Sequence, residues 1–412
     1  MTIDIRQSQM EMDAVATPNV VSLDVRMQRS TTGAEKGPRV AIVHYWLVSM
    51  RGGEKVVEEL CRIFPQADIF TLVLDRKRLS PFLQERKITT SFLQSVPGAR
   101  RHYTKMLPLM PFALEHFDLQ DYDLVISSEA GPAKGIITRP DALHICYCHS
   151  PMRYIWDQFH VYRRQTSRIG RLAMSLTAPW LRAWDVTTAA RVDAFVANSA
   201  YVKSRIERFY NRDASVIHPP VATDDFEVAE GRGEFYLYAG QLAGYKRADL
   251  AVKACSESGR RLVVIGEGEQ AAHLRAIAGQ NVTFLGHQPF SVLRDHLSRC
   301  RALLFPGTED FGIIPVEAMA CGRPVIAYDC GGARETVSSP QVGLRFARQD
   351  VAGLIEAIDT FEAREDTFDP LVIRQHAETF SAAVFRARFS ALVERELARR
   401  DLATAAMGVK QL

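Results

Sequence analysis

From Arg39 onward, short and almost wholly apolar runs alternate with longer segments in which apolar residues recur every three or four positions. Runs of the first kind are typical of strands buried on both faces of a parallel sheet, and segments of the second kind are typical of amphipathic helices. In the first half, strands are expected in "PRVAIVHYWL" and "ADIFTLVL" and at 122–129, 142–149 and 193–199, with helices at 52–64, 165–190 and 201–210. This alternation predicts a parallel sheet covered by helices.

The same alternation begins again after the proline pair in "SVIHPPV". Strands are expected in "GEFYLYAGQL", "RRLVVIGEGE", "NVTFLGH", "ALLFPG" and "RPVIAY", each followed by a helical segment except the last. The predicted fold class is therefore α/β, with two Rossmann-like doubly wound domains facing across a cleft. Ligands of such sheets bind beyond the carboxyl ends of the strands, so the cleft between the domains is the expected site.

The pattern divides the chain into four segments. Residues 1–38 are polar and without periodicity, and we expect a disordered N-terminal extension there. The first Rossmann-like domain is predicted at 39–220 and the second at 221–385. Residues 386–412 are expected to form a C-terminal helix and tail. A length of 412 residues agrees with two domains of roughly 100–200 residues each.

Composition narrows the class of protein. Hydrophobic residues make up 47% of the chain and charged residues 24%, which is typical of a soluble globular protein. A net charge of +3 gives no global signal for nucleic acid or membranes. The seven cysteines follow no regular spacing, which favours reduced thiols and a cytoplasmic protein. We expect neither a signal peptide nor a membrane-spanning helix, because no apolar run approaches the ~18–20 residues that spanning requires.

Two acids flank the start of a predicted helix in "EDFGIIPVEAMACGRPV". Glu309 is expected in the loop after a strand and Glu317 in the first helical turn, so that both can face one pocket. The N–H groups of Phe311 and Gly312 lie near the helix N-terminus, where an anion is stabilised. A sugar nucleotide needs such a set: an acid for sugar hydroxyls, N–H groups for the diphosphate and an acid for the ribose. The alternative is that Asp310 and Glu317 only favour the helix dipole.

Two loops of the second domain could contact the same ligand. Lys246 and Arg247 lie at a loop-to-helix junction and suit a diphosphate, although such pairs are often simply solvated. Gly266, Glu267 and Gly268 follow a strand and nominally match a dinucleotide fingerprint. They follow the second strand of their domain, and the next strand offers no acid for a ribose. We therefore interpret them as a loop that faces a nucleotide with little specificity.

The first domain offers three candidates. Gly52 and Gly53 open a helix and could approach a phosphate or an acceptor, or could simply form a turn. His149 comes just after a strand, where it could bind a sugar hydroxyl or stabilise charge, or could be structural. Cys146 and Cys148 suggest a metal site, but no second ligand pair follows at finger-like spacing, so no metal is expected.

Two stretches of the first domain, 86–111 and 163–184, are basic and apolar together. Such segments suit a helix on an anionic lipid surface or a diphosphate-lipid acceptor. The alternative is a helix packed on the core with solvated arginines. The basic candidates are Arg100, Arg101, Lys105, Arg168 and Arg171.

The motifs "RGGEK", "CHSP", "YKRADL", "VVIGEGE" and "EDFGIIPVEAMACGRPVIAYDCGGARETV" give the chain a family resemblance over about residues 39–400. It resembles glycosyltransferase family 4, which comprises retaining enzymes of the GT-B fold. "HICYCHSPMRYIWD" and "GHQPFSVLRDH" are similar to bacterial exopolysaccharide mannosyltransferases. Those enzymes transfer mannose from GDP-mannose to a polyprenyl-diphosphate-linked oligosaccharide. The resemblance implies that the first domain binds the acceptor and the second the nucleotide sugar.

The resemblance also implies roles for individual residues. Glu309 would contact the donor sugar, Lys246 would neutralise the leaving diphosphate, and His149 would support the sugar. Gln241 stands where many relatives carry an arginine, which leaves more of the diphosphate charge to Lys246. The implied donor-binding residues are Gly52, Gly53, Gln241, Arg247, Gly266, Glu267, Phe311, Gly312, Ile313 and Glu317.

The implied reaction is front-face retaining transfer without metal or other cofactor. The implied location is the cytoplasm, peripheral on the inner face of the cell membrane, with an anionic membrane surface as partner and no nucleic acid. Four alternatives stay open at this stage. They are a UDP-sugar-dependent glycosyltransferase acting on a lipid or lipopolysaccharide, a sugar-nucleotide epimerase, a Rossmann oxidoreductase, and a non-catalytic module that binds sugar nucleotides.

Overall fold

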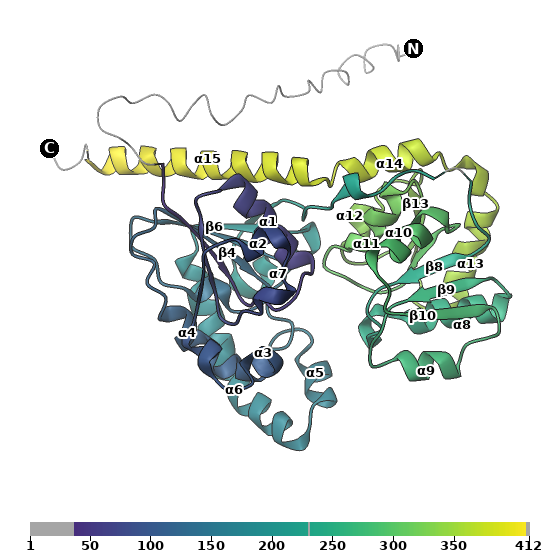
Figure 1. The fold of residues 1–412 in the computed structure, drawn as a ribbon, viewed down its shortest axis with the longest axis horizontal. Coiled ribbons are helices and arrows are strands. Elements are labelled where there is room, and N and C mark those ends of the chain that lie inside the picture. Colours follow the sequence, from purple (N-terminus) through teal and green to yellow (C-terminus); the bar gives the residue numbers. More distant parts are fainter. Residues whose placement is uncertain (1–36, 230, 409–412) are drawn as a thin grey trace, which may run out of the picture.

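Two parallel sheets, each in its own domain, form the protein in a computed structural model that describes residues 37–229 and 231–408, with side chains up to residue 402 (Figure 1). The predicted two-domain α/β architecture is confirmed. Nearly all of the expected N-terminal extension lies outside the described residues.

The N-terminal domain contains a seven-stranded sheet in the order β3-β2-β1-β4-β5-β6-β7, and every neighbouring pair is parallel. Its strands are β1 (Val40–His44), β2 (Asp68–Thr71), β3 (Ile88–Thr90), β4 (Leu124–Glu129), β5 (Leu143–Cys148), β6 (Ala194–Ala197) and β7 (Ala214–Val216). Its α-helices are α1 (Gly52–Ile63), α2 (Pro81–Gln84), α3 (Ala99–His102), α4 (Met110–Glu115), α5 (Phe159–Gln165), α6 (Arg168–Thr188) and α7 (Ala200–Tyr210), and the 3-10 segment η4 (Tyr103–Leu109) joins α3 to α4.

The C-terminal domain contains a six-stranded parallel sheet in the order β10-β9-β8-β11-β12-β13. Its strands are β8 (Tyr236–Ala239), β9 (Leu262–Ile265), β10 (Val282–Gly286), β11 (Leu303–Phe305), β12 (Val325–Tyr328) and β13 (Gly343–Phe346). The helices that follow β8 are α8 (Ala248–Ser258), α9 (Ala271–Ala276), α10 (Phe290–Arg299), α11 (Ile313–Ala320), α12 (Ala333–Thr336), α13 (Val351–Glu362), α14 (Pro370–Glu378) and α15 (Ala382–Gly408).

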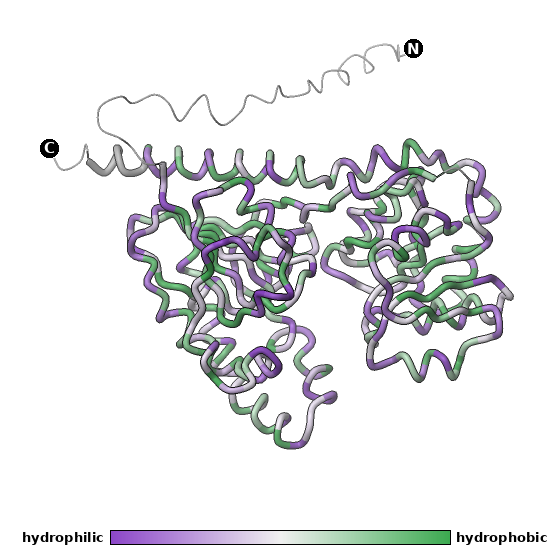
Figure 2. The backbone as a smooth tube through the Cα atoms, viewed as in Figure 1, coloured by the Kyte–Doolittle hydropathy of each residue, from purple (hydrophilic) through white to green (hydrophobic). Residues whose placement is uncertain are grey.

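Strand β1 shows why the apolar runs become central strands. Its five residues are all buried, and successive side chains enter different cores. Val40 and Ile42 belong to one hydrophobic cluster, whereas Ala41 and Val43 belong to another on the opposite face. A strand covered on both faces is apolar at most positions, and Figure 2 shows hydrophobic colour inside the sheets. The one polar residue of β1, His44, is buried as well and hydrogen-bonds to Ser128.

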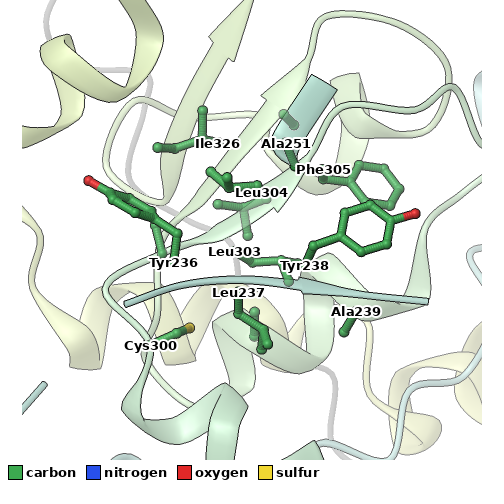
Figure 3. Packing of buried hydrophobic residues seen from close by; sticks show 14 of the residues in the cluster. Tyr236, Leu237, Tyr238, Ala239, Ala251, Cys300, Leu303, Leu304, Phe305 and Ile326 are labelled. Carbon is green, nitrogen blue, oxygen red and sulfur yellow. The ribbon is translucent and has the colours of Figure 1, made fainter. Parts of the chain in front are cut away.

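The second domain is built in the same way around β8 and β11. Figure 3 shows Tyr236, Leu237 and Tyr238 packed beside Leu304 and Phe305, all of them buried. This core holds the carboxyl ends of β8 and β11 next to each other, and the loops that leave those ends carry the predicted donor-binding residues Gln241, Arg247, Phe311 and Gly312.

The chain crosses between the domains twice, and the two crossings lie side by side. Val221 pairs in parallel with Ser381, and the Val221 N–H donates to the carbonyl of Phe380 at 3.0 Å. Helix α15 then runs back over the N-terminal domain, as Figure 1 shows in yellow. Phe385 and Phe389 are buried in the same cluster as Ile42, so this C-terminal helix is part of the first domain's core.

The sequence pattern missed three strands, β3, β7 and β13. All three lie at a sheet edge, and their sequences are "ITT", "ASV" and "GLRF". An edge strand has one neighbour and is only partly covered, so it carries no continuous apolar run that would reveal it.

Candidate active site

The acid loop, residues 308–312 between β11 and α11, carries the first predicted acid. Glu309 accepts a hydrogen bond from the Nζ of Lys246 at 2.8 Å, and the two side chains are only 22% and 18% exposed. Burial alone would lower the pKa of Lys246, but the charge of Glu309 outweighs it and the net pKa is raised. Lys246 is therefore a cation at neutral pH, held beside a carboxylate at the edge where β8 and β11 end.

Glycines bring the loops after β8, β9 and β11 into contact around this pair. A methyl group at Gly266 would lie 1.8 Å from the carbonyl oxygen of Gly240, and one at Gly268 would lie 2.4 Å from that of Leu242. A methyl group at Gly307 would lie 2.7 Å from the carbonyl oxygen of Lys246. The Gly-x-Gly pattern is thus explained by loop-to-loop packing, without a bound dinucleotide.

Glu317 is buried in α11 and faces the other domain. Its Oε1 lies 3.8 Å from the Nζ of Lys55 in α1. Burial raises the pKa of Glu317, and the charge of Lys55 partly offsets this. Because α11 begins at Ile313, Glu317 is the fifth helical residue and not a first-turn residue, which corrects the expected position.

The helix starts of α1 and α11 meet across the domain boundary. A methyl group at Gly52 would lie 2.7 Å from Cδ1 of Ile313. A methyl group at Gly53 would lie 3.2 Å from the hydroxyl of Tyr45 and 3.6 Å from Nε2 of His149. The glycine pair therefore brings the backbone of α1 close to both His149 and the second domain.

His149 follows β5, as the sequence predicts, and is fixed by hydrogen bonds. Its Nε2 pairs with the Ser128 hydroxyl at 2.9 Å, and that hydroxyl also pairs with Nδ1 of His44 at 3.1 Å. Its backbone N–H donates to the carbonyl of Glu129 at 2.6 Å. Burial lowers the pKa of His149 to about 4, although the charge of Asp310 acts in the opposite direction. The imidazole is therefore neutral at pH 7, able to exchange hydrogen bonds with a sugar hydroxyl.

The remaining predicted donor-binding residues lie on the same loops. Arg247, at a positive φ of 53°, is turned toward Asp249, with Nε to Oδ1 at 3.0 Å. Phe311 is buried, and Gly312, at φ 89°, immediately precedes α11.

Two further candidates lie in the loops after β9 and β8. The Oε1 of Glu267 accepts a hydrogen bond from the His287 N–H at 3.4 Å. Gln241 lies in the loop after β8, where its carbonyl accepts from the Ala243 N–H at 2.9 Å.

Sequence reasoning missed the contacts that Asp310 makes with the first domain. Its carboxylate pairs with Arg153 and with Arg205, whose NH1 lies 3.1 Å from Oδ1. Ser199 donates to the Asp310 carbonyl at 2.5 Å. The quoted "HICYCHSPMRYIWD" contains Arg153, but nothing in its spacing indicates a partner more than 150 residues away.

The basic candidates of the first domain gather elsewhere. Figure 1 shows α3, α4 and α6 together at the end of that domain opposite α15. Arg100, Arg101, Lys105, Arg168 and Arg171 are all exposed there. Apolar side chains of α6 are exposed too: Ile169, Leu172, Leu176 and Trp180 follow one another at helical spacing. The second half of the same helix is packed on the domain, where Ala178, Leu181, Asp185 and Thr188 are buried. Within the described ranges no helix is long and apolar enough to cross a bilayer.

The cysteines expected not to bind metal are core residues. Cys146 and Cys148 are fully buried in a hydrophobic cluster, and burial raises the pKa of both thiols. Among the residues that the structure describes, no group of three or more His, Cys, Asp or Glu side chains has an arrangement that could hold a metal ion.

Family models match both domains in succession. A model described as glycosyltransferase family 4 matches residues 50–225, and one described as glycosyl transferases group 1 matches residues 222–374. Together they extend over the acid loop, Lys246 and His149.

Individual relatives are distant. An uncharacterized glycosyltransferase of Methanocaldococcus jannaschii is 28% identical over 171 residues, which are 40% of this chain and 48% of the relative. A GDP-mannose-dependent monoacylated alpha-(1-6)-phosphatidylinositol monomannoside mannosyltransferase of Corynebacterium glutamicum is 36% identical over 134 residues, 29% of this chain and 35% of the relative. The chain thus matches about half or less of the length of these relatives.

The fold agrees with solved structures. A crystal structure of the Anabaena protein HepE in complex with UDP superposes with a TM-score of 0.62 over 87% of this chain and 100% of that one, at 14% identity. A likeness at this identity concerns the fold, and it places both domains in the same two-domain architecture.

Proposed function

The chain belongs to the glycosyltransferases of family 4 and group 1, and from this premise we propose that it is a retaining mannosyltransferase. Mannose would pass from GDP-mannose to a polyprenyl-diphosphate-linked oligosaccharide in exopolysaccharide biosynthesis. The enzyme would work as a cytoplasmic protein held on the inner face of the cell membrane.

The observation that carries the proposal is the Lys246–Glu309 pair, 2.8 Å apart at the ends of β8 and β11. A nucleotide diphosphate that enters this edge would attract the Lys246 ammonium, and Glu309 would become free to contact the sugar. A cation held in a partly buried place needs little reorganisation when charge develops on the leaving group, and such preorganisation is usually the largest single catalytic contribution.

The proposed chemistry follows from these positions. The bond from C1 of the sugar to the diphosphate oxygen breaks, and the acceptor hydroxyl bonds to C1 on the same face. The proton of that hydroxyl passes to the departing diphosphate, whose charge Lys246 and the N–H groups at the start of α11 compensate. Neutral His149 would bind a sugar hydroxyl, and buried Glu317 would accept hydrogen bonds from the ribose. No step of this scheme requires a metal.

The assignment of GDP-mannose as the donor is based on the relatives and on the family resemblance. The mannosyltransferase of Corynebacterium glutamicum is named for GDP-mannose and for a lipid acceptor. A UDP-sugar donor is the second candidate, because the Anabaena protein of the same fold was crystallised with UDP. The main argument for an oxidoreductase was the nominal dinucleotide fingerprint at Gly266 to Gly268, and the packing between loops accounts for those glycines.

An exposed apolar and basic surface supports the membrane part of the proposal. Ile169 is 83% exposed and Leu176 70%, and Trp180 stacks on Phe112 of α4 with ring centroids 5.9 Å apart. Figure 2 shows hydrophobic residues along α6 at this end of the domain. Apolar side chains flanked by arginines suit the boundary of an anionic bilayer, where a lipid-linked acceptor would be presented.

A transfer assay tests the proposal. The purified chain is incubated with radiolabelled GDP-mannose or UDP-glucose and a lipid extract from an exopolysaccharide-producing bacterium, in parallel reactions with and without EDTA. Label in the lipid fraction from GDP-mannose alone, absent with Glu309→Ala, is the expected result. Label from UDP-glucose alone would overturn the donor and keep the mechanism. Transfer that EDTA abolishes would overturn the metal-free scheme.

A further inference from the structure

Helix α7 of the first domain meets the second domain with its N-terminal end. The Ser199 hydroxyl caps the helix by accepting from the Val202 N–H at 3.1 Å, and it also donates to the Asp310 carbonyl at 2.5 Å. The Ala200 N–H donates to both carboxylate oxygens of Glu335, at 2.8 and 2.9 Å. A helix start with its unpaired N–H groups favours such a carboxylate.

One turn further along α7, Arg205 reaches the same loop. Arg205 is 7% exposed, and its guanidinium binds the Ser150 hydroxyl and the Asp157 carboxylate, both at 2.7 Å, as well as Asp310 at 3.1 Å. Arg153 pairs with the same carboxylate oxygen of Asp310. Asp310 is thus the one residue of the second domain on which two mostly buried arginines of the first domain converge, among the ion pairs of the described residues.

The acid loop is fixed from its own domain as well. The Gly332 N–H donates to the Glu309 carbonyl at 2.9 Å, and a methyl group at Gly331 would lie 2.3 Å from that oxygen. The carbonyl of Glu309 is therefore held by the second domain, and the carbonyl and side chain of Asp310 are held by the first. Adjacent residues of the acid loop are thus held by different domains: Glu309 by Gly332 and Lys246 of the second, and Asp310 by Ser199, Arg153 and Arg205 of the first.

We propose that Asp310, Arg153 and Arg205 form an inter-domain clamp that couples closure of the two domains to the placement of Glu309. They are positioning residues, and the clamp rests on the proposed function only in so far as Glu309 acts on the donor. When the domains separate, Asp310 loses both cations, the Ser199 contact breaks, and Glu309 is left attached to the second domain alone. With the domains apart, Glu309 is then not placed against a bound donor, and transfer does not occur.

The alternative is that Asp310 only neutralises two buried arginines. In that case its loss would lower the stability of the fold, because unpaired buried charge is costly, and would leave the geometry of the surviving enzyme unchanged. The clamp instead predicts an effect on turnover and on the separation of the domains at unchanged donor affinity.

Asp310→Asn removes the charge and keeps the shape. We expect kcat to fall at least about tenfold, since displacing a catalytic group by about 1 Å can cost on the order of 100-fold. KM for the donor should stay within about threefold, and small-angle X-ray scattering of the free protein should give a larger radius of gyration than wild type. Asp359→Asn, which breaks an ion pair with Arg260 inside the second domain, is the matched control and should change none of these quantities.

Arg153 provides the second arm. Arg153→Gln should reproduce the loss, Arg153→Lys should retain most of the activity, and Arg153→Gln combined with Asp310→Asn should lose little more than either alone, because both remove one contact. Wild-type kcat in Asp310→Asn, or a lower kcat with an unchanged radius of gyration, would overturn the clamp. The kcat measurements use whichever nucleotide sugar wild type turns over, so the test of the clamp stays valid even if the donor is not GDP-mannose. If wild type transfers no sugar, the proposed function fails and the scattering comparison alone decides the clamp.

Discussion

Gly52 at the start of α1 and Ile313 at the start of α11 touch across the domain boundary, with 2.7 Å between Cδ1 of Ile313 and the place where a methyl group on Gly52 would be. The starts of the two helices are therefore in close contact, with little room for a side chain at position 52. We expect this contact to limit how closely the domains approach on the side of α1.

Enlarging Gly52 should hold the domains apart. The end of an isoleucine side chain can rotate away, so Gly52→Ala is expected to keep kcat/KM within about threefold, whereas the two methyl groups of Gly52→Val should lower it by about tenfold or more. Steady-state kinetics on the two variants measures this. Ile313→Ala should restore much of the activity of Gly52→Val, and an equally active Gly52→Val would show that the contact does not limit closure.

Glu309→Ala should separate transfer from nucleotide binding. Turnover is expected to fall by on the order of 100- to 1000-fold, as when one preorganised stabilising group is removed. The affinity for nucleotide diphosphate should hold or rise, because Lys246 loses its competing carboxylate. Calorimetric titration with GDP measures this, and Lys246→Ala, in which binding should weaken, is the control. Retained turnover in Glu309→Ala would remove its assigned role.

Glu317→Ala should weaken donor binding through the ribose. A lost hydrogen bond to a charged group corresponds to roughly a tenfold or larger rise in the Kd of the nucleotide sugar. Lys55→Ala leaves the carboxylate in place and should have a smaller effect, although the two residues are 3.8 Å apart. Titration with donor and with its 2′-deoxy analogue provides the measurement. If Glu317→Ala binds the donor as tightly as wild type, the ribose assignment is wrong.

Leu176→Asp on α6 should lower binding to anionic vesicles by at least about tenfold, because it places a charge where the apolar face would enter the bilayer. Leu371→Asp on α14 of the second domain is a matched control, since both leucines are 70% exposed. Flotation with phosphatidylglycerol vesicles measures the bound fraction. Equal loss in both variants, or loss in neither, would contradict docking through α6.

The contribution of His149 and His144 to stability should fall as the pH is lowered from about 6.5 to about 4, whereas buried Glu129, whose pKa burial raises to about 7, acts in the opposite direction. Burial lowers the pKa of His149 and of His144 from 6.5 to about 4, so the unfolded chain takes up protons in this range that the folded chain does not. Uptake by the unfolded state destabilises the folded one. Thermal unfolding from pH 7 to pH 4.5 measures the trend, and His149→Gln should show a shallower dependence than wild type. If the stability of His149→Gln changed with pH as steeply as that of wild type, groups other than His149 would be taking up the protons.

The order of elements was predictable because it depends on local chemistry. A strand such as β1, covered on both faces, is apolar at most positions, and a loop at its carboxyl end is polar where a ligand binds. The candidates Glu309, Lys246 and His149 followed from that pattern together with the family resemblance. The edge strands β3, β7 and β13 did not, because their short, partly covered sequences carry no such run.

The sequence by itself determined two α/β domains, the site loops and the identity of the candidate acids, since each depends on a few neighbouring residues. Only the tertiary structure decided which charges meet. Asp310 pairs with Arg153 and Arg205 across the domain boundary, and Phe385 of α15 returns to the core of the first domain. Such contacts join residues more than 100 positions apart. Their partners are selected by how two sheets and their helices pack, a relation that no local pattern of hydrophobic and polar residues contains.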